Sequence, residues 1–178
     1  LGRRVDMHCD ETDDPMSRHV ETLACQTQRL GLQGRVAGSH LTSMHSMDNY
    51  YVSKLIPLMR EAGVAAVANP LINITMQGRH DTYPKRRGMT RVPELLAAGV
   101  PVAFGHDCVM DPWYPLGSGD MLEVAAMGAF LSRGVEVDLE RRIREDDGAD
   151  VAAEHHQVAV CGEPALKDER RLTDAGDA

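Results

Sequence analysis

The chain has 178 residues, about the length of one domain, and a formal net charge of −8. That charge argues against binding to a nucleic-acid backbone and favours a small polar substrate. The sequence shows no signal peptide, no apolar run near the roughly 20 residues that span a bilayer, and no CxxC pair among its four cysteines, so we expect a cytoplasmic protein with free thiols and no membrane or nucleic-acid partner.

Short β-like runs recur along the first two thirds of the chain. Their starts lie roughly 30 residues apart, which is the size of a βαβ unit. Each run ends in polar residues, which predicts a row of polar groups at one end of a sheet. The runs are Arg4–Cys9, Arg35–His40, Val64–Asn69 and Val100–His106.

Helical patterns fill most of the gaps. The first helix is expected to begin at a cap formed by Asp13 or Asp14, with Pro15 in its first turn, and to end at Gly31. The others are expected from Asp48 to Gly63 with a kink or late start at Pro57, from Arg91 to Ala98, and from near Ser118 onward.

A long polar segment, Asn69–Gly88, is interpreted as a functional lid or binding loop. Its basic residues Lys85, Arg86 and Arg87 are interpreted as solvated or internally paired, because the acidic balance of the chain disfavours a nucleic-acid site.

Alternating strands and helices predict an α/β fold with a parallel sheet. Polar residues at several strand ends favour a (β/α)8, TIM-type barrel over an open doubly wound sheet, in which the site concentrates at one switch point. A whole barrel needs at least about 200 residues, so residues 1–134 are expected to form half of one. Residues 135–178 are expected to be an acidic tail, weakly ordered or helical, because Asp138–Ala178 holds 12 acidic and 6 basic residues.

The first chemical cluster is V-D-M-H-C-D-E, Val5 to Glu11. Strand alternation places Asp6, His8 and Asp10 on one face, where His8 offers a nitrogen to a metal and Glu11 could move protons. The alternative is a hydrogen-bonded strand histidine beside an acidic capping loop.

Two further clusters end later strands. His40, in G-S-H, could orient a water or substrate, or be a structural histidine. Asp107, in F-G-H-D-C, could bind a metal and accept a proton from its water, or cap the next turn. His106 could support that ligand, and Trp113 could stack on a planar ring or simply pack.

Together these motifs resemble bacterial cytosine deaminases of the amidohydrolase superfamily. The resemblance implies a distorted barrel, of which this chain holds about the last four βα units, and one divalent metal ion, iron or zinc. The matching motifs are H-C-D-E at His8–Glu11, A-N-P-L-I-N-I at Ala68–Ile74, Q-G-R-H-D-T-Y-P-K-R-R-G at Gln77–Gly88 and F-G-H-D-C-V-M-D-P-W-Y-P-L-G at Phe104–Gly117.

The resemblance also implies roles for these residues. His8 and Asp107 would ligate the metal, and Asp107 would deprotonate the bound water, to which His40 would hydrogen-bond. Glu11 would contact the substrate and carry protons between the water and the ring. The implied reaction, part of pyrimidine salvage, converts free cytosine or 5-methylcytosine to uracil or thymine and ammonia. The resemblance also implies a homo-oligomeric parent, by which we mean the full-length enzyme that would contain this half-barrel.

Trp113 and Cys108 would line the substrate pocket. Typical cytosine deaminases carry a second aspartate where this chain has Cys108, near the 5-position of the ring. An uncharged thiol accepts a methyl group at lower desolvation cost. We therefore expect a full-length parent to favour 5-methylcytosine over cytosine more than an aspartate-bearing relative does.

Two departures from the family set limits on this chain. The H-x-H pair of the first strand and the glutamine that reads the pyrimidine edge are absent from the sequence. Two protein ligands are fewer than the three of most catalytic sites, so weak metal binding is expected. The family pattern also ends after about Gly134, as in a fragment or a shifted reading frame. The alternatives are an amidohydrolase for another cyclic amidine, such as isoguanine, and an inactive truncated remnant.

Overall fold

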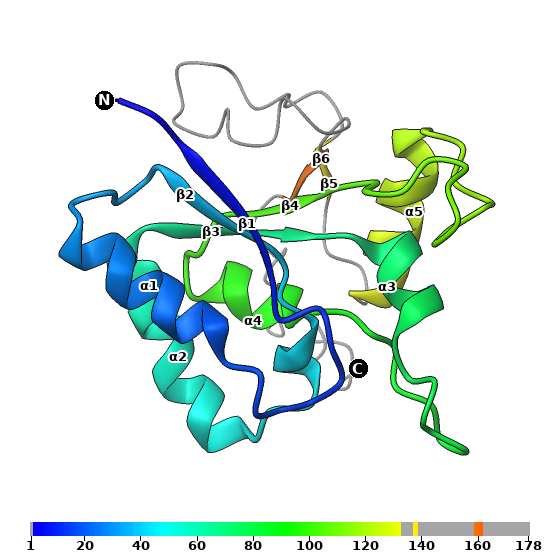
Figure 1. Cartoon of the computed structure of the whole chain (residues 1–178), viewed down its shortest axis with the longest axis horizontal. Helices are drawn as coiled ribbons and strands as arrows, with labels where there is room; N and C mark the ends of the chain where they lie inside the picture. The colour runs from blue at the N-terminus through cyan, green and yellow to red at the C-terminus, as the bar shows by residue number, and fades with distance from the viewer. Residues whose placement is uncertain (1, 133–136, 139–158, 162–178) are drawn as a thin grey trace, which may run out of the picture.

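The computed structural model describes residues 2–132, 137–138 and 159–161. Strands and helices alternate along the chain, and all four predicted strands are present (Figure 1). The elements are β1 (Val5–Cys9), α1 (His19–Arg29), β2 (Val36–His40), the 3-10 helix η1 (Thr42–His45), α2 (Asn49–Ala62), β3 (Val64–Ala68), α3 (Pro70–Met76), α4 (Val92–Ala97), β4 (Val102–Phe104), α5 (Met121–Leu131), β5 (Val137–Asp138) and β6 (Ala159–Cys161).

The first four strands form one parallel sheet in chain order. Val36 in β2 is in register with Val5 of β1 and Val64 of β3, so the strands begin level and their carboxyl ends share one edge. This parallel α/β sheet confirms the predicted fold class and is that of a partial barrel. The polar residues that close the strands are therefore brought to the same edge of the sheet.

The tail adds two strands to this sheet. β6 pairs antiparallel with β4, and β5 pairs antiparallel with β6. The tail was expected to be weakly ordered or helical, and the five residues of it that the structure describes are instead strands. The remainder of residues 135–178 lies outside the described residues.

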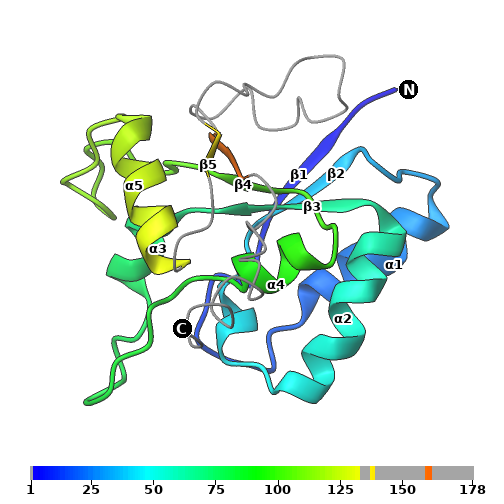
Figure 2. The same ribbon diagram turned by 180° about the vertical axis from the view of Figure 1, so that it is seen from behind.

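Helices α1, α2 and α4 lie on one side of the sheet, while α3 and α5 lie toward the carboxyl ends of β3 and β4 (Figures 1 and 2). The core between sheet and helices includes Val20, Met59, Leu95 and Phe104, none of which is exposed. Burying side chains of this size contributes about 1.5–3 kcal/mol each. No helix in the described part of the chain is long and apolar enough to cross a membrane.

Burial differs sharply between neighbouring strands. All five residues of β2 are buried, whereas the three central residues of β1 are exposed. β1 is the end strand of the described sheet and pairs there with β2 alone. The half-barrel is therefore open along the strand that carries His8.

Helix α2 has the ends that the sequence predicted. The Asp48 side chain accepts the backbone N–H of Tyr51 at 2.8 Å, and Gly63 ends the helix with a φ of 60°. The helix continues through Pro57 without a late start.

Helix α1 begins at His19, so the predicted cap at Asp13 or Asp14 was wrong. The buried Asp10 carboxylate accepts the backbone N–H groups of His19 and Val20 at 3.0 and 2.8 Å. Asp14 forms a local turn by accepting from Met16. The cap thus comes from the end of β1, and the Asp10 carboxylate is bonded to the start of α1.

The segment interpreted as a long loop contains helix α3, which the sequence analysis missed. Pro70 occupies its first turn, where a missing N–H costs nothing. In the remaining loop, Arg86 is paired with Asp81 at 2.7 Å and donates to the backbone oxygen of Asp13. The predicted internal pairing is therefore confirmed for Arg86.

Helix α5 also begins later than expected. It starts at Met121, capped by Asp120, whose side chain accepts the N–H of Leu122, and not near Ser118.

Candidate metal centre

The candidate centre lies where three parallel strands end. His8 is in β1, His40 is the last residue of β2, and Asp107 follows β4. His40 and Asp107 have φ values of 71° and 66°. Left-handed backbone costs a non-glycine residue about 1–2 kcal/mol, and such strain concentrates at functional sites.

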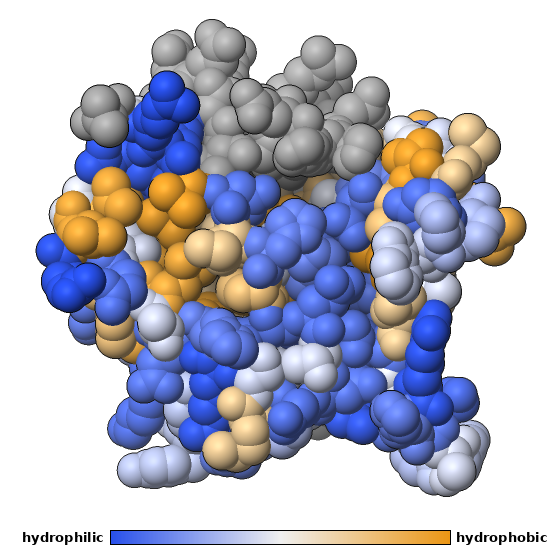
Figure 3. All heavy atoms as spheres, viewed as in Figure 1, coloured by the Kyte–Doolittle hydropathy of each residue, from blue (hydrophilic) through white to orange (hydrophobic). Residues whose placement is uncertain are grey.

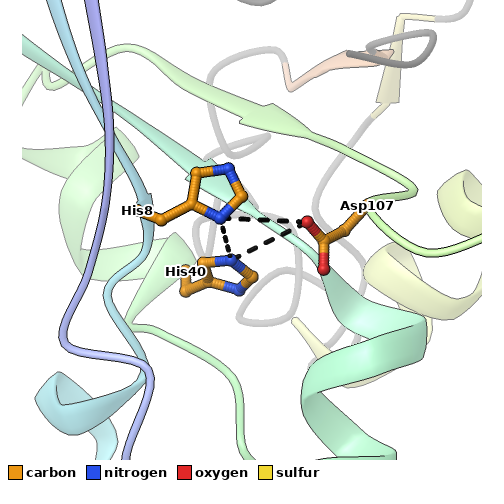
Figure 4. Close-up of side chains that lie close together, drawn as sticks. All are labelled: His8, His40 and Asp107. Atoms are coloured by element: carbon orange, nitrogen blue, oxygen red, sulfur yellow. Dashed lines mark hydrogen bonds and ion pairs between the residues drawn. The ribbon is translucent and has the colours of Figure 1, made fainter. Parts of the chain in front are cut away.

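His8, His40 and Asp107 point toward one another (Figure 4). His8 Nδ1 lies 2.9 Å from His40 Nε2 and 4.0 Å from Asp107 Oδ1. His40 Nε2 lies 3.8 Å from Asp107 Oδ1. Two ligand atoms bound to one tetrahedral zinc ion at about 2.1 Å lie roughly 3.4 Å apart. The His8 nitrogen and the Asp107 oxygen are 4.0 Å apart, so a single ion would hold both after a small shift of the exposed His8 side chain.

These three side chains differ in exposure. The His8 side chain is 54% exposed and that of Asp107 is 18% exposed, whereas that of His40 is 1% exposed. Burial lowers the pKa of His40 to about 4, although the charge of Asp107 acts in the opposite direction. His40 is therefore neutral at neutral pH, and His8 faces the open side.

The Glu11 carboxylate lies beside His40, with its Oε1 atom 3.4 Å from His40 Nδ1. Burial raises the pKa of Glu11, and the negative charge of Asp107 raises it further. A carboxyl group with a raised pKa suits general acid–base chemistry near neutral pH. The structure thus brings four of the predicted residues, Glu11, His8, His40 and Asp107, to one place.

Cys108 and Trp113 differ in their surroundings. Cys108 is buried, and its Sγ lies 3.3 Å from Asp107 Oδ2; burial raises the pKa of this thiol. Trp113 is 65% exposed, on a turn in which the Asp111 side chain accepts its backbone N–H. Their contacts with substrate stay predictions. Cys9, Cys25 and Cys108 are free thiols, as expected.

His106 stabilises the loop after β4. It is fully buried, and its Nε2 accepts the backbone N–H of Gly119 at 2.9 Å. The ring thus ties the residue before Asp107 to the start of α5, instead of hydrogen-bonding the ligand itself.

The sequence analysis missed Asn73 as a site residue. Asn73 and Asn69 are both buried, and their Nδ2 atoms lie 3.0 and 3.2 Å from His40 Nδ1. The available signal was the spacing N-P-L-I-N, because residues four apart share one face of a helix.

A pocket of about 600 Å³ lies along β1 and α1, beside the centre. It is lined by His8 and Glu11 together with apolar groups such as Met7 and Leu23, and not by His40 or Asp107. Apolar side chains gather on this face over β1, β2 and α1 (Figure 3).

The chain belongs to the amidohydrolase family, since a family model of that description matches residues 1–163. It is 37% identical over 124 residues to a pterin deaminase from Rhizobium rhizogenes, covering 69% of this chain and 28% of that protein. It is 26% identical over 121 residues to an N-isopropylammelide isopropyl amidohydrolase from Pseudomonas sp. (strain ADP), covering 68% and 27%.

Two solved structures are also similar to this chain. A 5-methylcytosine deaminase from Klebsiella pneumoniae, liganded with 5-fluorocytosine, is 41% identical with a TM-score of 0.76 over 92% of this chain and 41% of that one. An N-isopropylammelide isopropylaminohydrolase from Burkholderia multivorans is 30% identical with a TM-score of 0.61, covering 86% and 34%. The chain therefore spans less than half the length of these relatives.

Proposed function

We propose that this chain supplies about the last four βα units of a metal-dependent deaminase of free pyrimidine bases. The reaction would convert cytosine or 5-methylcytosine, with water, to uracil or thymine and ammonia. The observation that carries the proposal is the convergence of Glu11, His8, His40 and Asp107 at the ends of parallel strands. The similarity to a 5-methylcytosine deaminase supports it.

His8 Nδ1 and Asp107 Oδ1 would hold one divalent ion, iron or zinc. Their nitrogen and oxygen chemistry fits such an ion, and a small shift of the exposed His8 side chain would close their 4.0 Å separation to the roughly 3.4 Å of tetrahedral ligands. When bound, the ion supplies a Lewis acid that lowers the pKa of a water molecule toward about 7. The family resemblance adds an H-x-H pair that this sequence does not contain, so this chain alone would bind the ion weakly.

Asp107 and Glu11 would carry out different proton transfers in this reaction. Asp107 is placed to accept a proton from the attacking water, and the neutral His40 ring faces the same space through Nε2. Glu11 would deliver a proton to a ring nitrogen and later to the leaving amino group. A C–O bond forms and a C–N bond breaks at one ring carbon. The water gives up both of its protons, one of which stays on the ring nitrogen while the other leaves with ammonia.

Glu11 gives the direct test in the full-length parent. Glu11→Gln keeps the size of the side chain but removes the acid–base group, so kcat should fall on the order of 10²–10⁴-fold. Metal content should stay unchanged, because Glu11 is not one of the proposed ligands. Unchanged kcat would remove Glu11 from the mechanism, and a parent inert toward every base would indicate a remnant.

Cys108 extends the proposal to the 5-position of the ring. The buried thiol is uncharged and directly follows Asp107. One methyl group in a pocket is worth about 1–3 kcal/mol. In the parent, Cys108→Asp should lower the 5-methylcytosine to cytosine ratio of kcat/KM by about 10-fold or more. An unchanged ratio would refute this role.

A second candidate is an amidohydrolase that acts on another cyclic amidine, such as isoguanine. Similarity to a pterin deaminase and to N-isopropylammelide hydrolases favours keeping it. The kcat/KM of the parent for cytosine, 5-methylcytosine, isoguanine and pterin separates the two, because the proposal requires a pyrimidine to rank first. A cytoplasmic location, a homo-oligomeric parent and the absence of membrane or nucleic-acid partners stay predictions.

A further inference from the structure

One nitrogen of His40 is enclosed by two buried amides. Asn69 is 2% exposed and Asn73 is 1% exposed, and the Nδ2 atom of each lies within hydrogen-bond distance of His40 Nδ1. An amide nitrogen only donates. Nδ1 therefore accepts, provided that the amides are oriented with nitrogen toward the ring.

The orientation of Asn73 is set by a second contact. Its Oδ1 accepts the backbone N–H of Asn69 at 3.3 Å. Rotating the amide by half a turn would place an NH2 group against that N–H, and two donors would then face each other in a buried site. Nδ1 of His40 therefore accepts a hydrogen bond from Asn73 and carries no proton. The neighbouring Asn69 amide can then hydrogen-bond to Nδ1 only through its own nitrogen.

A neutral imidazole carries one proton, so an accepting Nδ1 leaves the proton on Nε2. His40 Nε2 faces His8 Nδ1 at 2.9 Å and Asp107 Oδ1 at 3.8 Å, and both atoms can accept a hydrogen bond. A protonated ring nitrogen has no free lone pair for a metal. His40 is thereby a donor toward the centre and not a third ligand of it.

Glu11 is the group that could oppose this arrangement, since a carboxylate favours a proton on Nδ1. Its Oε1 is 3.4 Å from Nδ1, farther than either amide nitrogen and beyond the usual 2.7–3.2 Å for N–H···O bonds. The two amide nitrogens are therefore the closer hydrogen-bond partners of His40 Nδ1.

We propose that Asn69 and Asn73 are positioning residues that fix His40 in its Nε2–H tautomer, as a hydrogen-bond donor to the metal centre. What receives that hydrogen bond during a reaction rests on the proposed function. The tautomer itself does not, because it follows from contacts within this chain.

The test is the long-range 1H–15N spectrum of histidine side chains in the 178-residue chain, recorded metal-free near pH 8. The His40 signals are assigned as those that His40→Gln removes. The expected pattern is a protonated, pyrrole-type Nε2 and an unprotonated, pyridine-type Nδ1. A pyrrole-type Nδ1 in the unmodified chain would overturn the proposal without any variant having to fold.

Asn73→Asp then replaces the amide donor by an acceptor of the same shape. It should move the His40 proton to Nδ1, or protonate both nitrogens. Asn49→Asp is the matched control, because Asn49 is exposed at the start of α2 and uses its oxygen to accept from Arg91. An Asn73→Asp spectrum that keeps the Nε2–H pattern, in a chain with native backbone shifts, would also overturn the proposal. Since no substrate is present, an inactive parent would leave either result intact.

Discussion

Replacing Gly105 with alanine should destabilise the chain by disturbing the amides around His40. Gly105 directly follows β4 and is buried. A Cβ atom at this position would lie 2.4 Å from Asn69 Oδ1 and 3.2 Å from Val67 Cγ1. The Gly105 backbone cannot easily move away, because its N–H donates to the Ala68 oxygen at 2.9 Å.

The size of the effect follows from these contacts. A carbon and an oxygen need about 3.3–3.6 Å, so the Asn69 amide must move by about 1 Å and lose at least one hydrogen bond. Overpacking costs about 1–3 kcal/mol, and a lost neutral hydrogen bond costs about 0.5–1.5 kcal/mol. The free energy of unfolding should therefore fall by about 2–4 kcal/mol, which lowers Tm by about 4–16 °C in a chain of this length.

Gly38→Ala is the matched control for this experiment. Gly38 is also buried, but the atoms nearest to its added Cβ are the flexible ends of Leu41 and Leu23, at 3.0 and 3.3 Å. Alanine is also favoured over glycine inside a strand by about 0.5–1 kcal/mol, so this variant should stay within about 1 kcal/mol of the original chain. Urea unfolding and thermal melts measure both. A Gly105→Ala chain as stable as Gly38→Ala would refute the packing argument.

Two further outcomes are expected. Asp107→Asn removes the negative charge of a proposed metal ligand, so the zinc affinity of the chain, measured by competition with a chromophoric chelator, should fall at least about 10-fold; an unchanged affinity would exclude Asp107 as a ligand. His45→Gln should flatten the loss of stability in acid. Burial is the main cause that lowers the pKa of His45 from 6.5, and Arg86 adds to it, although Asp13 and Asp81 act in the opposite direction. The folded chain therefore binds this proton less readily than the unfolded chain, and stability is lost as the pH falls below 6.5. Melts between pH 5 and 8 that have the same slope in both chains would contradict this.

The sheet could be predicted from the sequence because its strands are short apolar runs that end in polar residues. A parallel arrangement then places His8, His40 and Asp107 at one edge, whatever the details of the helices. The start of α1 could not be predicted, because its cap is the Asp10 carboxylate at the end of β1. That contact depends on how the strand end and the helix meet in space.

Asn73 could not be assigned to the site because its position depends on a helix that begins directly after β3. Pro70 begins α3, and the Asn73 side chain reaches back to the backbone of Asn69. Seven residues that begin with a proline and include an asparagine give too weak a helical pattern to distinguish from a loop. The direction of the hydrogen bonds at His40 is even harder to predict from the sequence, because it depends on the orientation of the Asn73 amide.

The backbone at the strand ends explains why a catalytic interpretation is preferable to a structural one. His40 and Asp107 turn the chain out of the sheet in left-handed conformations that glycine adopts at no steric cost. If these positions served only the turns, glycine would relieve about 1–2 kcal/mol of strain at each. An imidazole that is 1% exposed and a carboxylate that is 18% exposed stand there instead, with their polar atoms 3.8 Å apart. Stability alone does not account for that choice, whereas the proposed function does, because Asp107 would ligate the ion and His40 would donate a hydrogen bond to the water beside it.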